Sequence, residues 1–255
     1  ENEFVVSTTH LLYNPRREDV RLAQTQVLFT EIDRIAYKYN ALEDTDHIPV
    51  IVTGDFNLTP DSAVYRLITD GFLKYEHLSN RSLSKNTTYA NVTGKVLIPT
   101  LLRITDSCQH ADLVEQRNKY GTIDRNEELK LIQLQHSERD NVNKTGKKAH
   151  KSSFSSGTLS HHLNLKSAYI HNHGNDTEAT TFQNKWVTVD YIFYSGEVSE
   201  ETQKRKDDRL KLLSRFTLPT SEQIQGLRIP NFAFGSDHLL LVVTLVVANI
   251  FMAED

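Results

Sequence analysis

The residue types best suited to chemistry lie directly after a short apolar run. Residues 50–52 (Val-Ile-Val) are apolar without alternation, which predicts a strand buried on both faces. Gly54 permits a tight turn, and Asp55 and Asn57 follow just past the strand end, where open α/β sheets bind ligands. If the extended conformation continues, both side chains point the same way, and a carboxylate beside an amide suits metal-assisted chemistry on a phosphate. The alternative is that Asp55 and Asn57 only close a turn or cap the next helix.

Further polar signals flank other predicted strands. His10 ends the first strand, Asp190 lies in an aromatic strand where an unpaired charge is costly, and Asp237-His238 precedes the last strand. Taken singly, a histidine at a strand end is more often structural than catalytic. Because all these residues lie at strand ends of what reads as one sheet system, we expect them to form one site.

Hydrolysis of a phosphodiester explains this mixture of residues. Carboxylates can hold a divalent metal that neutralises phosphate charge and lowers the pKa of a bound water. An aspartate can orient or deprotonate the attacking water, while asparagine and histidine donate hydrogen bonds to developing negative charge. Asp190 suits a carboxylate that holds His238 in one tautomer and supports its protonated form. The sequence has no P-loop, no Cys-x-x-Cys zinc pair and no serine nucleophile elbow.

The elements that must position these residues alternate between strand and helix. A strand is predicted over residues 4–9 and a helix over 18–39. After the strand at residue 50, Thr59 is the expected N-cap of a second helix that Gly71 terminates. This order favours an α/β layered fold. Further strands are expected, a pair at 180–182 and 187–194 and a last strand at 239–247, whereas 210–215 is a short apolar-basic segment.

Composition narrows the class of protein. The chain has 255 residues, a net charge of −4 and a mean hydropathy of −0.47, so no global basic footprint marks it as a duplex-DNA binder. A single cysteine, Cys108, excludes a disulfide framework and fits a reducing compartment. No apolar run reaches membrane-spanning length, and no signal peptide is apparent. We therefore expect an intracellular protein, cytoplasmic and/or nuclear, without a membrane partner.

Four motifs in order resemble those of the endonuclease/exonuclease/phosphatase superfamily. They are Thr9-His10, Gly54-Asp55-Phe56-Asn57, Val189-Asp190-Tyr191-Ile192 and Ser236-Asp237-His238. The segments at 9–17 and 19–24 are similar to the angel branch of the deadenylase-like group, as is 210–215. The resemblance implies an α/β fold of two β-sheets in a sandwich flanked by helices, which is the DNase I-like fold. We expect residues 1–255 to be the C-terminal portion of one such domain, incomplete at its N-terminus, with a polar insertion at about 137–162.

The resemblance also implies roles for individual residues. Asp55 corresponds to the carboxylate that activates water, and Asn57 and His10 contact the phosphate or its surroundings. Asp190 orients His238, which stabilises the transition state. Asp237 lies by the metal, and Pro15 and Trp186 are candidates for contacting the terminal base. For Trp186, packing in the core is an equally good interpretation.

The function implied is Mg²⁺-dependent phosphoesterase activity on RNA 3′ ends, with Mn²⁺ as an alternative ion. The reaction is either 3′–5′ removal of poly(A) or removal of a terminal 2′,3′-cyclic phosphate. The family's early metal-binding glutamate has no counterpart here, so we expect little catalysis by this chain alone. The alternatives are a non-catalytic binding protein of the mRNA-decay or translation machinery, and a phosphoesterase of the same fold acting on DNA or inositol lipids.

Overall fold

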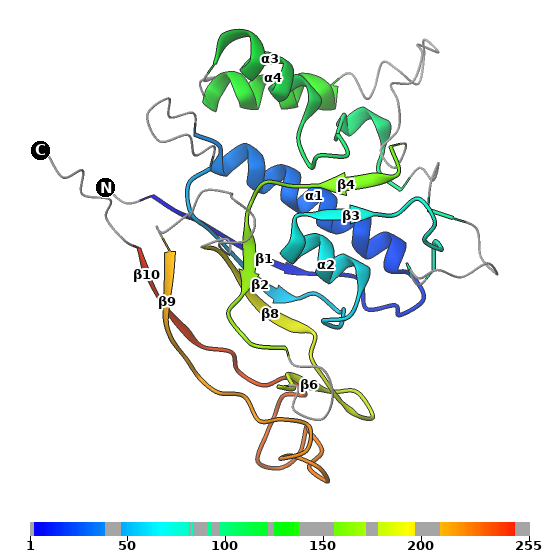
Figure 1. Cartoon of the computed structure of the whole chain (residues 1–255), viewed down its shortest axis with the longest axis vertical. Coiled ribbons are helices and arrows are strands. Elements are labelled where there is room, and N and C mark those ends of the chain that lie inside the picture. Colours follow the sequence, from blue (N-terminus) through cyan, green and yellow to red (C-terminus); the bar gives the residue numbers. More distant parts are fainter. Residues whose placement is uncertain are drawn as a thin grey trace, which may run out of the picture. The chain divides into compact units, whose positions relative to one another are not determined.

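The protein was analysed as a computed structural model, shown in Figure 1. The structure describes residues 3–38, 47–81, 83, 91–92, 97–121, 125–137, 156–171, 178–196 and 210–247. The chain divides into two compact units. The first comprises residues 1–13, 49–71 and 163–255, and the second comprises residues 14–48 and 72–162.

A four-stranded sheet with the order β1-β2-β8-β5 forms the centre of the first unit (Figure 1). Strand β1 (Val5–His10) runs parallel to β2 (Val50–Asp55), and β8 (Asp190–Ser195) runs antiparallel to both β2 and β5 (Leu165–Ser167). The β-branched Val50 and Val52 are fully buried, as the apolar run at this position predicts.

The two faces of this sheet bury different partners. Phe193 of β8 packs with the aromatic rings of Phe56 and Tyr65, the latter on helix α2 (Ala63–Asp70). On the other face, Ile51 and Ile192 pack against a buried cluster that includes strand β9 (Leu210–Arg215) and strand β10 (Val243–Val247). Strands β9 and β10 pair antiparallel, so this unit has two β-layers and a helix.

Helices dominate the second unit. Helix α1 (Glu18–Ala36), helix α3 (Ala111–Tyr120), helix α4 (Arg125–Ser137) and the 3₁₀ turn Thr100–Leu102 are its helical elements among the described residues. Strand β3 (Phe72–Lys74) pairs with β4 (Thr158–Ser160). Helix α1 carries buried charge, because the carboxylate of Asp33 accepts hydrogen bonds from Arg117, His47 and Gln109. No helix that the structure describes is both long and apolar enough to cross a membrane.

The observed elements correct several expectations. Ser62 is the N-cap of α2, because its hydroxyl accepts the N–H of Tyr65, whereas the Thr59 hydroxyl is bonded to Asp61. The strand predicted from residue 239 begins only at Val243. The predicted 187–194 strand is two elements, since Trp186–Val187 (β7) pairs with Thr181–Phe182 (β6) while β8 joins the central sheet. Most of the predicted insertion at 137–162 lies outside the described residues, and its end contains β4.

Candidate active site

Strand register brings three of the predicted residues together. His10 of β1 is paired with Asp55 of β2, and Asp55 is paired with Asp190 of β8. Paired residues share a face of the sheet, and residues two apart along a strand share it too. Asp55 is therefore on the face of Ile51, which packs towards the β9 and β10 layer. The same hydrophobic pattern that fixes the register thus places the polar strand ends side by side.

Gly54 allows β1 and β2 to approach this closely. Its φ is +136°, and an added Cβ would lie 1.9 Å from the carbonyl oxygen of Thr9. No side chain fits there, so only glycine gives the backbone pairing that sets Asp55 beside His10. The glycine before Asp55 is thus a requirement of the site's geometry.

After Asp55 the extended conformation stops. Asn57 has a positive φ of 51°, and its backbone N–H donates to Asp55 Oδ1 at 2.8 Å. The Asn57 side-chain nitrogen donates to the carbonyl of Leu11 at 2.9 Å. Asp55 therefore closes a turn with one carboxylate oxygen, as one interpretation of the sequence proposed, while its other oxygen faces the histidines of the site.

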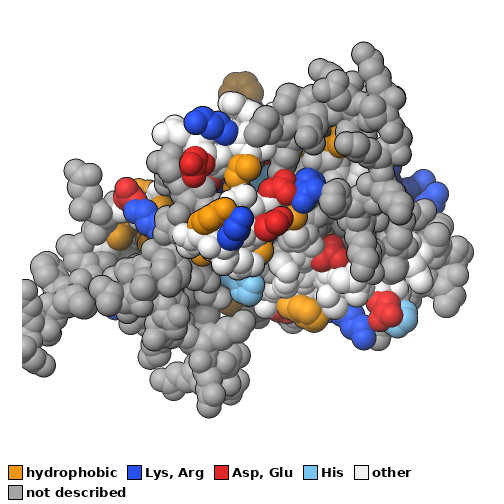
Figure 2. Space-filling model, turned by 90° about the horizontal axis from the view of Figure 1, so that it is seen from above, with side chains coloured by type: hydrophobic (Ala, Val, Ile, Leu, Met, Phe, Trp, Pro, Cys, Tyr) orange, Lys and Arg blue, Asp and Glu red, His pale blue; other side chains and the backbone are white. Residues whose placement is uncertain are grey.

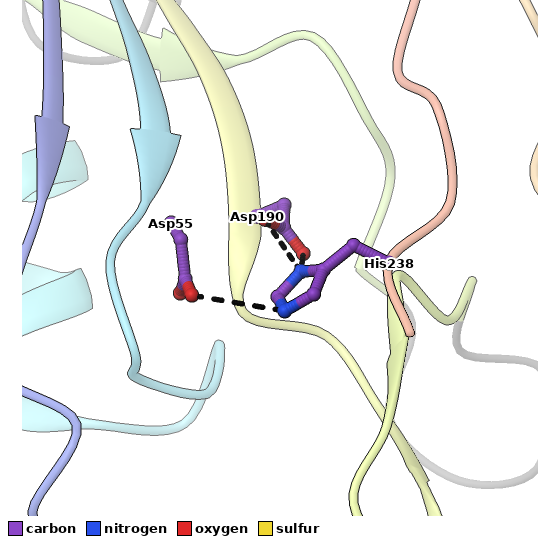
Figure 3. A group of neighbouring side chains, drawn as sticks. All are labelled: Asp55, Asp190 and His238. Carbon is purple, nitrogen blue, oxygen red and sulfur yellow. Dashed lines mark hydrogen bonds and ion pairs between the residues drawn. The ribbon is translucent and has the colours of Figure 1, made fainter. Parts of the chain in front are cut away.

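The imidazole of His238 lies between two carboxylates (Figure 3). Its Nδ1 is 2.9 Å from Asp190 Oδ2 and 3.1 Å from Asp190 Oδ1. Its Nε2 is 3.9 Å from Asp55 Oδ2. With Nδ1 engaged by Asp190, the ring presents Nε2 towards Asp55 and towards any substrate bound there.

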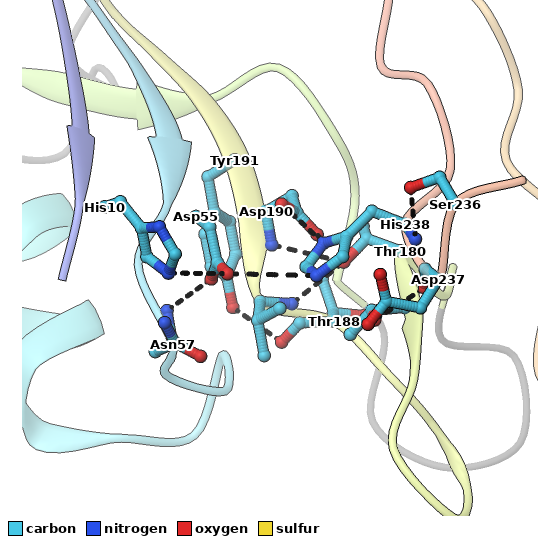
Figure 4. A network of polar contacts seen from close by, with 12 residues as sticks. His10, Asp55, Asn57, Thr180, Thr188, Asp190, Tyr191, Ser236, Asp237 and His238 are labelled. Carbon is cyan, nitrogen blue, oxygen red and sulfur yellow. Dashed lines mark hydrogen bonds and ion pairs between the residues drawn. The ribbon is translucent and has the colours of Figure 1, made fainter. Parts of the chain in front are cut away.

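His238 is positioned by backbone contacts with a hairpin. Thr181 forms a β-bridge with His238, and its hydroxyl donates to the carbonyl of Asp237 at 2.7 Å. The Thr180 hydroxyl accepts the backbone N–H groups of Val189 and Asp190 (Figure 4). These contacts join the segment that carries His238 to the start of β8. Sequence reasoning did not identify Thr180 and Thr181 as site residues, because a threonine pair in a predicted strand carries no signal of this role.

The first strand adds a second histidine. His10 Nε2 lies 3.5 Å from Asp55 Oδ2, and its side chain is 73% exposed. Figure 4 shows it on the side of Asp55 opposite to His238. A phosphate group bound in front of Asp55 would therefore have an imidazole on each side, His238 on one and the exposed His10 on the other.

The electrostatics of the site raise the pKa of both His238 and Asp55. Partial burial raises the pKa of Asp55, although the N–H of Asn57 opposes the shift, and the charge of Asp190 raises it further. Burial alone would lower the pKa of His238, but the hydrogen bond with Asp190 and its charge raise it above the ordinary value. The site thus pairs a hydrogen-bond donor whose protonated form Asp190 supports with a carboxylate of raised pKa, which suits hydrolysis of an anionic substrate.

The remaining predicted residues are less closely associated with the group formed by Asp55, Asp190 and His238. The Asp237 residue is exposed, and its backbone carbonyl accepts bonds from Thr181 and from Phe182 N–H. The Trp186 indole donates to the carbonyl of Leu227 at 3.1 Å and packs edge-on against Phe182. Pro15 belongs to the second unit. The metal role of Asp237 and the base contacts of Pro15 and Trp186 stay predictions.

Among the described residues, Asp55, Asp190 and His238 form a group that could hold a metal ion, with ligand atoms within 4.8 Å of one another. Two carboxylates and an imidazole fit a divalent cation in chemical type. Carboxylate oxygens keep lone pairs when they accept a hydrogen bond, so Asp55 and Asp190 could bind an ion while Asp190 still holds Nδ1 of His238.

Comparison with known proteins identifies related chains. Residues 5–238 match the protein-family model described as the Endonuclease/Exonuclease/phosphatase family. Protein angel homolog 1 of Rattus norvegicus is 33% identical over 280 residues, covering 94% of this chain and 41% of the relative. Protein angel homolog 2 of Homo sapiens is 34% identical over 250 residues, covering 93% and 43%. The chain thus spans about two-fifths of the length of these relatives.

Solved structures give a consistent match. A crystal structure of ANGEL2, a 2′,3′-cyclic phosphatase, matches with a TM-score of 0.63 and 28% identity, covering 95% of this chain and 56% of that one. A second structure, of ANGEL2 in complex with adenosine-2′,3′-vanadate, matches with the same TM-score and identity.

Proposed function

Because this chain belongs to the Endonuclease/Exonuclease/phosphatase family, we propose that it supplies part of the active site of a phosphoesterase acting on RNA 3′ ends. The family resemblance and the DNase I-like α/β fold expected from the sequence are confirmed. The observation that carries the proposal is His238, held by Asp190 on one ring nitrogen and directed at Asp55 by the other. The preferred reaction is opening of a terminal 2′,3′-cyclic phosphate, in line with the 2′,3′-cyclic phosphatase activity of ANGEL2.

Each side chain then has a role that its geometry supports. Asp55 orients the attacking water and accepts its proton, and its raised pKa suits a base. His238 donates from Nε2 to a phosphate oxygen as charge develops, while Asp190 holds the ring. The water oxygen bonds to phosphorus and one phosphorus–oxygen bond to the ribose breaks. The freed ribose oxygen takes up a proton from solvent, and Asp55 returns the proton it accepted to solvent. His10 and Asn57 contact the phosphate in this proposal.

A divalent cation fits the site as a charge-neutralising partner. Mg²⁺ binds few carboxylates and keeps several waters, and the Asp55 and Asp190 oxygens offer such a sparse set, with Asp237 as a further candidate. Mn²⁺ takes the same ligand types. Bound there, the ion would lower the pKa of water and neutralise phosphate charge.

The substrate proposal favours an RNA end over duplex DNA. On the face shown in Figure 2, Lys and Arg side chains are interspersed with Asp and Glu among the described residues. The net charge of −4 likewise disfavours sequence-independent duplex binding, which relies on a positive field. An RNA terminus needs only local contacts to its phosphate and unstacked bases.

The test is a substrate panel with the full-length protein in Mg²⁺ or Mn²⁺. RNA ending in a 2′,3′-cyclic phosphate, poly(A), abasic duplex DNA and a phosphoinositide would be compared. We expect turnover of the cyclic-phosphate RNA, loss of it in EDTA, and a loss of about 10²- to 10⁴-fold in Asp55→Ala and in His238→Ala.

Asp70→Asn is the matched control, since Asp70 is an exposed carboxylate at the end of α2 in the same unit. Normal turnover in Asp55→Ala or His238→Ala would exclude this site as the catalytic centre. RNA binding with no metal-dependent turnover of any substrate would instead support a non-catalytic binding protein.

A further inference from the structure

A loop that leads into His238 exposes two aromatic rings. Over residues 227–238, the side chain of Phe232 is fully exposed and that of Phe234 is 47% exposed. Burial of an aromatic ring is a large source of stability, so a ring fully in water on an ordered loop calls for a reason.

The loop is ordered by one asparagine. The Asn231 side-chain oxygen accepts the backbone N–H groups of Ala233 and Phe234 at 2.8 and 2.9 Å. Its side-chain nitrogen donates to the carbonyl of Arg228 at 2.7 Å, and its backbone N–H donates to the carbonyl of Phe234 at 2.8 Å. Four hydrogen bonds on one residue fix the turn, so Phe232 is presented to solvent by a defined backbone.

Both ends of the loop are tied to the hairpin that positions the catalytic histidine. The Trp186 indole donates to the carbonyl of Leu227 at one end. At the other end, Phe182 N–H and the Thr181 hydroxyl donate to the carbonyl of Asp237. Phe232 is six residues before His238, and an extended chain of six residues spans at most about 20 Å. The Cα atom of Phe232 therefore lies at most about 20 Å from that of His238, a span that a few nucleotides of single-stranded RNA can cover.

The loop also carries a cation. Arg228 is exposed, and among the described residues its guanidinium has no ion-pair partner. Exposed aromatic rings beside a basic side chain are the features that bind single-stranded nucleic acid: bases stack on the rings and the cation meets phosphate. The rings can stack with any of the four bases, because every base has a π-face.

We propose that Phe232, with Phe234 and Arg228 beside it, binds the RNA strand upstream of its terminal nucleotide by stacking with a nucleobase. The inference rests on the proposed function at the Asp55 and His238 site, and it extends that site to a second nucleotide. It predicts that the enzyme prefers an oligonucleotide over a mononucleotide carrying the same terminal cyclic phosphate.

The experiment measures this preference in the full-length protein. Adenosine 2′,3′-cyclic phosphate and a single-stranded oligonucleotide ending in a 2′,3′-cyclic phosphate are the two substrates. We expect Phe232→Ala to lower the ratio of kcat/KM for the oligonucleotide to kcat/KM for the mononucleotide by roughly five- to hundred-fold. Phe232→Trp should restore the ratio and Phe232→Leu should not, because leucine is apolar without a π-face.

Phe216→Ala is the control, since Phe216 is another exposed phenylalanine (63%) in the same unit but outside the loop, and it should keep the wild-type ratio. An unchanged ratio in Phe232→Ala, or full rescue by leucine, would overturn the proposal. Loss of self-association in Phe232→Ala with an unchanged ratio would show that the rings form a protein interface instead. If the wild type hydrolyses neither substrate, the proposed function fails. Fluorescence anisotropy with the oligonucleotide then decides whether Phe232→Ala weakens RNA binding.

Discussion

His238 Nδ1 lies 2.9 Å from Asp190 Oδ2, and the two residues reach each other from segments 48 positions apart in the sequence. The pair fixes which ring nitrogen faces Asp55. The hydrogen bond and the charge of Asp190 also outweigh the effect of burial and raise the pKa of His238. Position and charge of the imidazole thus depend on the same carboxylate.

Replacing Asp190 by asparagine should lower the pKa of His238. Asparagine keeps the side-chain size but removes the negative charge, while the partial burial that disfavours imidazolium stays. We expect the pKa of His238 to fall, although the charges of Asp55 and Asp237 continue to raise it. Ring-proton NMR of the protein in EDTA measures it directly, with Asp70→Asn as the control. An unchanged His238 pKa in Asp190→Asn would show that Asp190 does not set its charge.

Gly54 offers a test of how the strands are brought together. In Gly54→Ala, the new Cβ would meet the Thr9 carbonyl at 1.9 Å, and alanine is strained at a φ of +136°. We expect a loss of about 2–4 kcal/mol in the free energy of unfolding. Urea denaturation measures this loss.

Gly226→Ala is the matched control for Gly54→Ala. Gly226 also has a positive φ, of +93°, but an added Cβ there meets nothing within 4 Å. It should therefore cost only the backbone strain, of the order of 1 kcal/mol. Equal losses in the two variants would show that close approach of β1 and β2 is unimportant.

The sequence predicts the parts of this site that depend on local pattern. The apolar run at 50–52 lies in the predicted strand, with Val50 and Val52 fully buried and Ile51 partly buried, and Gly71 ends α2 with a left-handed φ of 69°. The sequence also predicts the pairing of His238 with Asp190, but the backbone contacts that hold the His238 segment against β6 are harder to foresee. Strands β6 and β7 have two residues each, too short for a period-two pattern, and their role comes from long-range backbone contacts.

The same limit applies to helix α1. The sequence gives no sign that Asp33 and Arg117 form a pair, yet their side chains are only 7% and 6% exposed and pair at 2.8 Å across 84 residues. Helical spacing does not reveal such a pair, because a polar residue on an apolar face looks like an exception until its partner is known. The fold of the chain, rather than the spacing of residues within a helix, brings Asp33 and Arg117 together.

Removing Arg117 should therefore destabilise the second unit strongly. In Arg117→Met the Asp33 carboxylate keeps His47 and Gln109 as partners but loses its cation, and the ring of Tyr37 loses the guanidinium 3.7 Å from its centre. We expect a loss of about 3–5 kcal/mol in the free energy of unfolding, measured in urea. Lys74→Met, which breaks an exposed pair with Glu76, is the control and should cost less than about 1 kcal/mol. A small loss in Arg117→Met would mean that Asp33 is satisfied without it.

Glu31 links stability to pH. Its hydrogen bond with the buried His110, together with Arg34, lowers its pKa to about 2 despite partial burial. A carboxylate whose folded pKa is depressed stabilises the fold fully above its ordinary pKa of 4.5, and the contribution is lost as the pH falls towards 2.

Because the Glu31 side chain is 40% exposed, water screens its interaction with His110, and we expect Glu31→Gln to cost no more than about 1 kcal/mol at pH 7. Urea unfolding at pH 7 and pH 3 should show the difference from wild type shrinking at the lower pH. The exposed Glu222→Gln should match wild type at both values, and a Glu31→Gln loss that is the same at pH 7 and pH 3 would contradict the linkage.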